Sequence, residues 1–246
     1  MRSFYLLLMV LVPGLIQAQS DSSARKIINR AGSVLSKFGS RGTGGLSLEE
    51  VAAGLKEALS VGALNSTKLL SQADGFFGNA LIKILMPEEA RRVEQVLRTA
   101  GLGNLVDKAI LSMNRAAEDA AQSAAPIFSD AIRQMSFQDA MAILKGSDTA
   151  ATTYLRQTTS AALTMAFRPV IERSLEKTEA TRHWKEVFDA YNKLPTTFKK
   201  VNADLPAYVT ERSLGGLFYQ VAEEEKKIRK DPQARVTEIL KKVFAR

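Results

Sequence analysis

Apolar residues recur every three or four positions along most of the chain after residue 46. This spacing predicts amphipathic α-helices, whereas no stretch alternates convincingly at period two, as a half-buried strand would. We therefore predict an all-α fold, in which a single compact multi-helix bundle over residues 46–246 follows a tethered N-terminal amphipathic helix. The helices are expected from Ser47 onward, then over 88–100, 105–121, 126–135 and 136–144, from 147 onward, around 184–191, over 205–230, and from 231 to the C-terminus.

Several helix ends carry recognisable signals. Ser47 and Glu50 have the spacing of a capping box, in which each side chain binds the other residue's backbone N–H. Ser147 or Asp148 is expected to cap a helix that continues through Tyr154, Leu155, Ala162 and Met165, and Pro169 must end or kink that helix. Similar signals elsewhere are Pro87 as a first helical residue, Gly101 and Gly103 as stops, Ser136 as a cap, and Asp231 with Pro232 before the final helix.

The first 45 residues differ from the rest. Arg2, the apolar run 4–16 and Ala18 have the order of a cleaved secretory signal over residues 1–18, with cleavage expected after Ala18. Residues 21–38 then place Ile27, Ile28, Leu35 and Phe38 on one helical face and Arg25, Lys26 and Arg30 on another. Four glycines within 39–45 predict a flexible linker, so residues 19–45 form a tethered basic helix that rests on a membrane, docks on a partner, or packs on its own body.

Composition limits the chemistry. There is no Cys and only one His, His183, so disulfides, thiol nucleophiles, thiolate zinc sites, paired-His metal sites and a lipoprotein anchor are excluded, and we expect no metal and no cofactor. The 34 Lys and Arg outnumber the 26 Asp and Glu, for a net charge of +8. Clustered positive charge attracts anionic lipids or glycans, but no basic stretch carries interleaved aromatics, so nucleic acid is not an expected partner.

Five stretches of the chain resemble a known family. They are 54–59 (GLKEAL), 74–79 (DGFFGN), 111–118 (LSMNRAAE), 148–152 (DTAAT), and 216–219 (GLFY) running into 222–227 (AEEEKK). The chain resembles the bacterial exported family of domain of unknown function 4197 over most of residues 46–246. It departs from that pattern at residues 85–87, where a proline would be expected earlier. The resemblance implies a helical envelope or secreted protein, and it supplies no activity and no catalytic residue.

Glu225 is the most informative candidate residue, because it falls on an apolar stripe with Leu214, Leu217, Phe218, Val221 and Ile228. A carboxylate on a core-facing stripe is costly unless it is hydrogen-bonded or paired with a cation. We expect Arg115 or Arg156 to be that cation. A structural ion pair is favoured over a ligand or catalytic site, since structural networks also perturb carboxylates. The remaining site candidates are Asn114, Asp148, Tyr208 and Tyr219, of which the tyrosines either line a pocket or lie at the core edge with satisfied hydroxyls.

Three functions remain in competition, and one of them, a purely structural or assembly role, has the same sequence features as the favoured one. The favoured one is an exported, non-enzymatic helical protein that binds an apolar or lipid ligand, a membrane surface or an envelope protein. The alternative is a carboxylate-dependent hydrolase in which Glu225, Asp148 and Arg115 converge at one cleft. Chance gives about one Ser-x-x-Lys match in a chain of this composition, so the two at Ser23 and Ser174 are weak evidence for a Ser nucleophile with a Lys base. The oligomeric state is not readable from these patterns.

Overall fold

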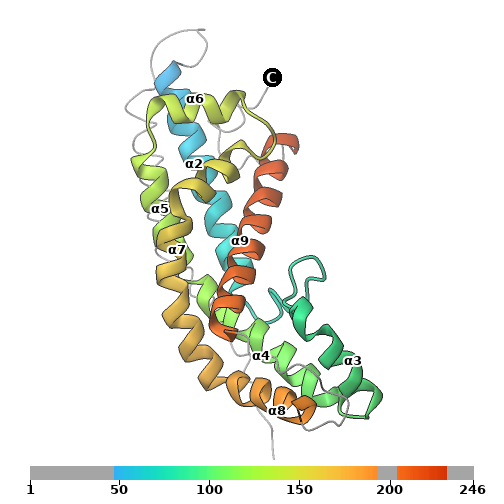
Figure 1. Ribbon diagram of the computed structural model, residues 1–246. Coiled ribbons are helices and arrows are strands. Elements are labelled where there is room, and N and C mark those ends of the chain that lie inside the picture. Colours follow the sequence, from blue (N-terminus) through green and yellow to red (C-terminus); the bar gives the residue numbers. More distant parts are fainter. Residues whose placement is uncertain (1–46, 193–203, 232–246) are drawn as a thin grey trace, which may run out of the picture. The chain divides into compact units, whose positions relative to one another are not determined.

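The regular elements are helices throughout the described part of the chain, as predicted. A computed structural model describes residues 47–192 and 204–231, which lie within one compact unit, Leu46–Arg246 (Figure 1). Residues 1–45, most of the expected 195–204 loop and the expected C-terminal helix fall outside the described residues. The elements are α2 (Leu48–Leu70), η1 (Glu88–Ala90), α3 (Arg91–Thr99), α4 (Gly103–Ala121), α5 (Ala124–Gln134), α6 (Phe137–Lys145), α7 (Ala150–Lys177), α8 (Ala180–Asn192) and α9 (Leu205–Lys230).

Helix α4 lies at the centre of the bundle, where it packs against α2, α3, α5, α7, α8 and α9 (Figure 1). Small side chains allow these neighbours to approach closely, and five buried alanines of α4 serve this purpose: Ala109, Ala116, Ala117, Ala120 and Ala121. Larger side chains fill the spaces between the helices, among them the buried Phe76, Phe128, Phe167 and Phe218. The core is therefore continuous from α2 to α9.

Two predicted caps are confirmed. Glu50 N–H donates to Ser47 Oγ at 3.2 Å, and Ser47 N–H donates to Glu50 Oε2 at 2.8 Å, which completes the capping box of α2. Ser136 and Asp139 make the same reciprocal arrangement at the start of α6. Helix α9 has the predicted bounds, and its cap is Asp204, which accepts the Ala207 N–H at 3.0 Å.

Two predictions about proline need correction. Pro87 is not a helical residue, because its ψ of 157° is extended, and it precedes the short η1 so that α3 begins only at Arg91. Of the two outcomes predicted for Pro169, an end or a kink, the end is wrong, since α7 continues through it to Lys177. The fully buried Phe167 and Ile171 lie on either side of Pro169, and their packing outweighs the lost backbone hydrogen bond.

Of the two glycines predicted to end α3, one does so, and the predicted course of α7 through Ala162 and Met165 is confirmed. Gly101 ends α3, with φ of +78° and the Leu102 N–H donating to Leu97 O at 2.8 Å, but Gly103 begins α4 instead of ending α3. Ala162 and Met165 belong to the apolar pattern of α7 but are exposed, Met165 at 78%. Both lie on a face of α7 that no described element covers.

Candidate functional site

Glu225 caps a helix that is distant in sequence. Its Oε1 accepts the Ala151 N–H at 3.0 Å, and its Oε2 accepts both the N–H and the hydroxyl of Thr152 at 2.8 Å. These are the second and third residues of α7, whose own flanking residue Thr149 supplies no side-chain cap. A carboxylate at this position satisfies unpaired backbone donors and opposes the positive end of the helix dipole.

The cation beside Glu225 is Arg229, so the prediction of Arg115 or Arg156 is wrong. Arg229 Nε and Nη2 lie 3.0 and 2.9 Å from Glu225 Oε1, and Nη2 also donates to Ile143 O at 2.9 Å. Both side chains are nearly buried, at 5% and 11% exposure. The partner lies one helical turn away because α9 presents both residues toward the start of α7.

Asp148 is not the cap of α7, although it lies beside that helix start. Its carboxylate pairs instead with Lys230 Nζ at 2.9 Å, and hydrogen bonding to Lys230 lowers the pKa of Asp148. The cavity next to Glu225, lined also by Leu55, Leu59 and Ile228, has about 10 Å³. That is room for about one water molecule and not for a substrate.

A second pair of buried polar residues, on α4, holds the 71–87 loop between α2 and η1. Asn114 accepts the Ile84 N–H at 2.9 Å and donates to Ile84 O at 2.8 Å, so its amide pairs with the loop as a neighbouring strand would. Glu118, one turn later, accepts the N–H groups of Phe76 and Phe77 at 3.1 and 3.2 Å. Asn114, one of the candidate site residues, therefore uses its amide oxygen and nitrogen to hold the loop.

Arg115 lies with the α4 residues Asn114 and Glu118 that bind the 71–87 loop, and it does not lie beside Glu225. Its guanidinium bonds Glu118 at 2.6 Å and Asp74 at 2.8 Å, and hydrogen bonding to Glu118 raises the pKa of Arg115. The structure therefore gives Glu225, Asp148 and Arg115 different partners and does not gather them in one cleft.

The two candidate tyrosines lie at the edge of the core. Tyr208 donates its hydroxyl to Leu85 O at 2.8 Å, which adds a third clamp on the 71–87 loop. Tyr219 is half-buried and packs against the same core.

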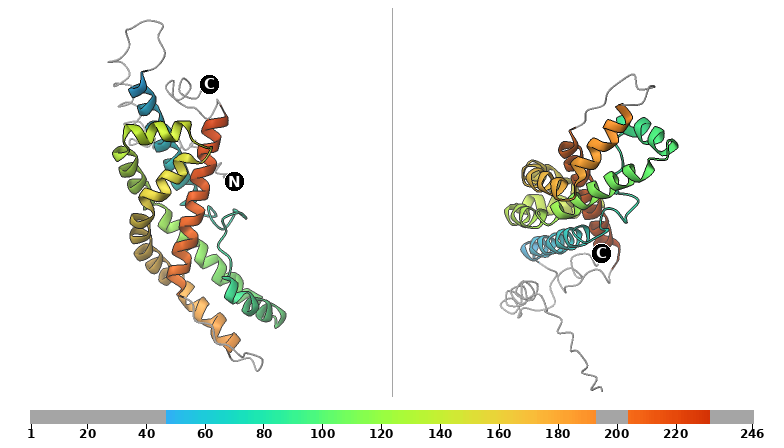
Figure 2. Two further views of the ribbon diagram at one scale, coloured as in Figure 1. Left: turned by 45° about the horizontal axis from the view of Figure 1, so that its top comes forward. Right: turned by 90° about the horizontal axis from the view of Figure 1, so that it is seen from below.

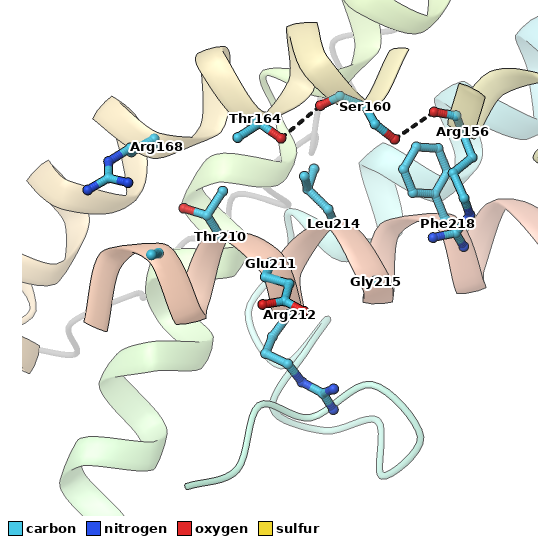
Figure 3. Close-up of a pocket in the computed structure, with 11 residues that line it drawn as sticks. Arg156, Ser160, Thr164, Arg168, Thr210, Glu211, Arg212, Leu214, Gly215 and Phe218 are labelled. Carbon is cyan, nitrogen blue, oxygen red and sulfur yellow. Dashed lines mark hydrogen bonds between the residues drawn. The ribbon is translucent and has the colours of Figure 1, made fainter. Parts of the chain in front are cut away.

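A groove with a volume of about 420 Å³ lies between α7 and α9 (Figure 3). Its α7 side carries one side chain per turn: Arg156, Ser160, Thr164 and Arg168. Its α9 side is formed by Ala207, Thr210, Glu211, Arg212, Leu214, Gly215 and Phe218. Small residues on both helices keep it open, and a Cβ placed on Gly215 would meet nothing within 4 Å.

Arg156, predicted as an ion-pair partner, lies at one end of this groove instead. Its guanidinium carbon is 4.5 Å from the centroid of the Phe218 ring. Phe218 is buried and meets Phe128 edge to face at 5.9 Å, so the ring that orients the guanidinium is fixed in the core. In the part of the chain that is described, Arg156 has no carboxylate partner.

The sequence analysis did not predict the groove, although the spacing of polar residues in α7 could have indicated it. Arg156, Ser160, Thr164 and Arg168 recur every four residues and so share one face of α7. Arg229 had the same signal, being four residues after Glu225. The sequence of α7 does not show that its Arg156–Arg168 face packs beside α9. The sequence of α9 likewise does not show that Glu225 and Arg229 face the start of α7.

The described ranges hold neither a metal-ligand cluster nor a membrane-spanning helix. No three His, Asp or Glu side chains of residues 47–192 and 204–231 gather as metal ligands would. None of the helices described there combines the length and apolar character needed to cross a membrane.

Comparison with known proteins identifies one relationship. The family model described as Protein of unknown function (DUF4197) matches residues 45–245, which is most of the chain. No curated protein and no solved structure matches.

Proposed function

Because the chain belongs to the DUF4197 family, whose description names no activity, we propose its function from the groove between α7 and α9. The protein is an exported, non-enzymatic binding protein of the cell envelope, and its ligand is a small amphiphile with an anionic head group. The observation that carries this proposal is the guanidinium of Arg156, which is held over Phe218 at the groove and has no carboxylate partner among the described residues.

The hydrogen-bond donors of the groove favour an anion. Ser160, Thr164 and Thr210 each donate their hydroxyl to a carbonyl one turn earlier, so these donors are engaged. Arg168 already contacts Glu172 and Asp204, at 3.0 and 3.3 Å. Arg156 and Arg212 are therefore the groove cations that have no carboxylate partner among the described residues, and Glu211 is the acidic side chain that lines the same groove. Of these two cations, Arg156 is the one held over the Phe218 ring. A guanidinium binds carboxylate or phosphate groups with two parallel hydrogen bonds.

The size and lining of the groove favour an amphiphile. A volume of about 420 Å³ falls in the range of small-molecule sites. Leu214, Ala207 and the edge of Phe218 supply apolar surface, and the α7 stripe between the two arginines carries only the hydroxyls of Ser160 and Thr164. A short apolar chain can lie along this surface while its head group pairs with Arg156.

Export is supported by the N-terminal sequence alone. Arg2, the apolar run 4–16 and Ala18 have the order of a cleaved signal, and a periplasmic or secreted protein would begin at Gln19. Intact mass measurement of the chain recovered from the exported fraction tests this part separately from ligand binding.

The ligand proposal is tested by calorimetric titration with octyl phosphate below its micelle concentration. We expect the wild-type chain to bind octyl phosphate and not uncharged octanol. Arg156→Gln should weaken binding about tenfold or more, because it removes a charge-assisted pair.

A matched pair at Gly215 tests the location. Gly215→Leu should abolish binding by filling the groove, whereas Gly215→Ala should retain it, since its methyl group meets no atom within 4 Å. Equal binding by Gly215→Leu and wild type, or equal binding of octanol and octyl phosphate, contradicts the proposal.

A further inference from the structure

The 71–87 loop is unusual because it is long, lacks α-helix and is nevertheless held at several points. Loops of this length in compact domains are commonly functional or disordered. Here Asn114 holds Ile84, Glu118 holds Phe76 and Phe77, and Tyr208 holds Leu85 O. The loop backbone therefore has a defined conformation.

Contact with α9 fixes the same loop further. A Cβ on Gly216 would lie 2.6 Å from Phe76 Cε1 and 3.3 Å from Ile82 Cβ, so only glycine admits the loop at this distance. Figures 1 and 2 both show the loop beside α9, on the outside of the bundle. The loop is thus a rigid surface feature.

The loop directs two leucines into solvent. Its residues alternate from position 81 to 86: Ile82, Ile84 and Met86 are buried, whereas Leu81 and Leu85 are 73% and 53% exposed. Lys83 lies between the two leucines in the same alternation and is half-buried. Because the inward residues are locked in the core, Leu81 and Leu85 cannot turn inward without breaking the clamps.

Two cations accompany these leucines. Lys83 Nζ lies 3.6 Å from the Phe77 ring centroid. Arg212, which is also among the residues that line the α7–α9 groove, is four residues from both Tyr208 and Gly216, which contact the loop. Its side chain points away from α7 in Figure 3. Neither cation has a carboxylate partner within residues 47–192 and 204–231.

We propose that Leu81 and Leu85 insert into the interface of an anionic membrane while Lys83 and Arg212 contact its head groups. The pairing of exposed leucines with unneutralised cations is the composition of a membrane-interface contact. A protein groove would have to supply both an apolar pocket and acidic residues, whereas anionic lipid supplies both properties at any point of its surface. The proposal does not depend on a ligand in the α7–α9 groove.

The absence of cysteine permits a direct test on the full chain, because one introduced thiol is labelled uniquely. A polarity-sensitive fluorophore is attached to the thiol of Leu81→Cys. The labelled protein is then mixed with vesicles of equal parts phosphatidylcholine and phosphatidylglycerol. We expect a blue shift on binding and quenching by nitroxide-labelled lipid. The matched control is Leu64→Cys on α2, whose leucine is 41% exposed and lies outside the loop, and its label should not shift.

Flotation of unlabelled variants measures the contribution of each group. Leu81→Ser with Leu85→Ser should lower vesicle affinity about tenfold or more, and Leu64→Ser with Leu69→Ser should leave it unchanged. Lys83→Gln and Arg212→Gln should each weaken binding about fivefold on anionic vesicles and not on neutral ones.

Three results would overturn the proposal. The first is a chain that does not bind anionic vesicles. The second is a chain that binds them while the label at position 81 stays in water, which would assign attachment to residues 21–38. The third is a label that shifts only when a protein from the envelope is added, which would make the loop a protein contact.

Discussion

Three buried polar side chains, Glu225, Glu118 and Asn114, all bind backbone groups of a segment distant in sequence. Each would be costly in the core without a partner. Each instead satisfies N–H groups at a helix start or in a loop, where the backbone has no partner of its own. At the scale of single residues, these three buried side chains therefore have structural roles.

Substitution of Glu225 should test this role. Glu225→Gln should lower the free energy of unfolding by about 3 kcal/mol, because it leaves Arg229 without its charged partner in a buried position. Urea unfolding measures the change. Glu224→Gln, on the same helical turn but half-buried, should change stability by less than about 0.5 kcal/mol.

The same variants separate structure from binding. Glu225→Gln should bind octyl phosphate as the wild type does, since Glu225 does not line the groove. A stable Glu225→Gln variant that has lost ligand binding would reverse this assignment.

At the scale of elements, the helices differ in how their first turns are satisfied. Helices α2 and α6 carry capping boxes of their own, and α9 is capped by Asp204. Helix α7 depends on Glu225 of α9. The start of α7 is consequently stable only when α9 is in place.

Asp204 should make the stability of α9 depend on pH. Hydrogen bonding to the Ala207 N–H, with a smaller effect of Arg168, lowers the pKa of Asp204. A carboxylate whose pKa is lower in the folded state contributes stability that is present above its unfolded pKa, about 4, and is lost as pH falls through the folded value. Asp204→Asn keeps a capping oxygen that does not titrate.

Unfolding at a series of pH values checks this expectation. The stability advantage of wild type over Asp204→Asn should shrink as pH falls below about 4. Asp204→Ala should cost about 1 kcal/mol at neutral pH, because it removes the cap. A difference between wild type and Asp204→Asn that is constant across this range would show that the carboxylate charge has no role.

At the scale of the whole molecule, α4 connects the parts of the bundle that are described. It packs against six other α-helices, whereas the short α6 packs mainly against α2 and α7. Local opening follows the number of buried contacts that must be broken.

Amide hydrogen exchange should reflect this arrangement. We expect the slowest exchange in α4, around Met113 and Ala117, whose side chains are fully buried. The amides of α6 should exchange faster at every pH, and exchange of α4 before α6 would contradict a core centred on α4.

The amino-acid sequence by itself determined the helical class, most helix positions, the caps at Ser47 and Ser136, and the family to which the chain belongs. These features depend on residues within a few positions of one another, so local spacing is enough to reveal them. The buried position of Glu225 was also evident, since its apolar neighbours recur at helical spacing.

Only the tertiary structure decided which groups meet. Glu225 contacts residues more than seventy positions away, and the choice of Arg229 over Arg115 or Arg156 depends on how α9 is turned against α7. The groove exists because the Arg156–Arg168 stripe of α7 faces α9 where Ala207, Thr210 and Gly215 leave space. The leucines of the 71–87 loop are exposed because contacts from α4 and α9 hold the alternate side chains inside. Such pairings depend on the packing of whole helices, which local residue preferences do not specify.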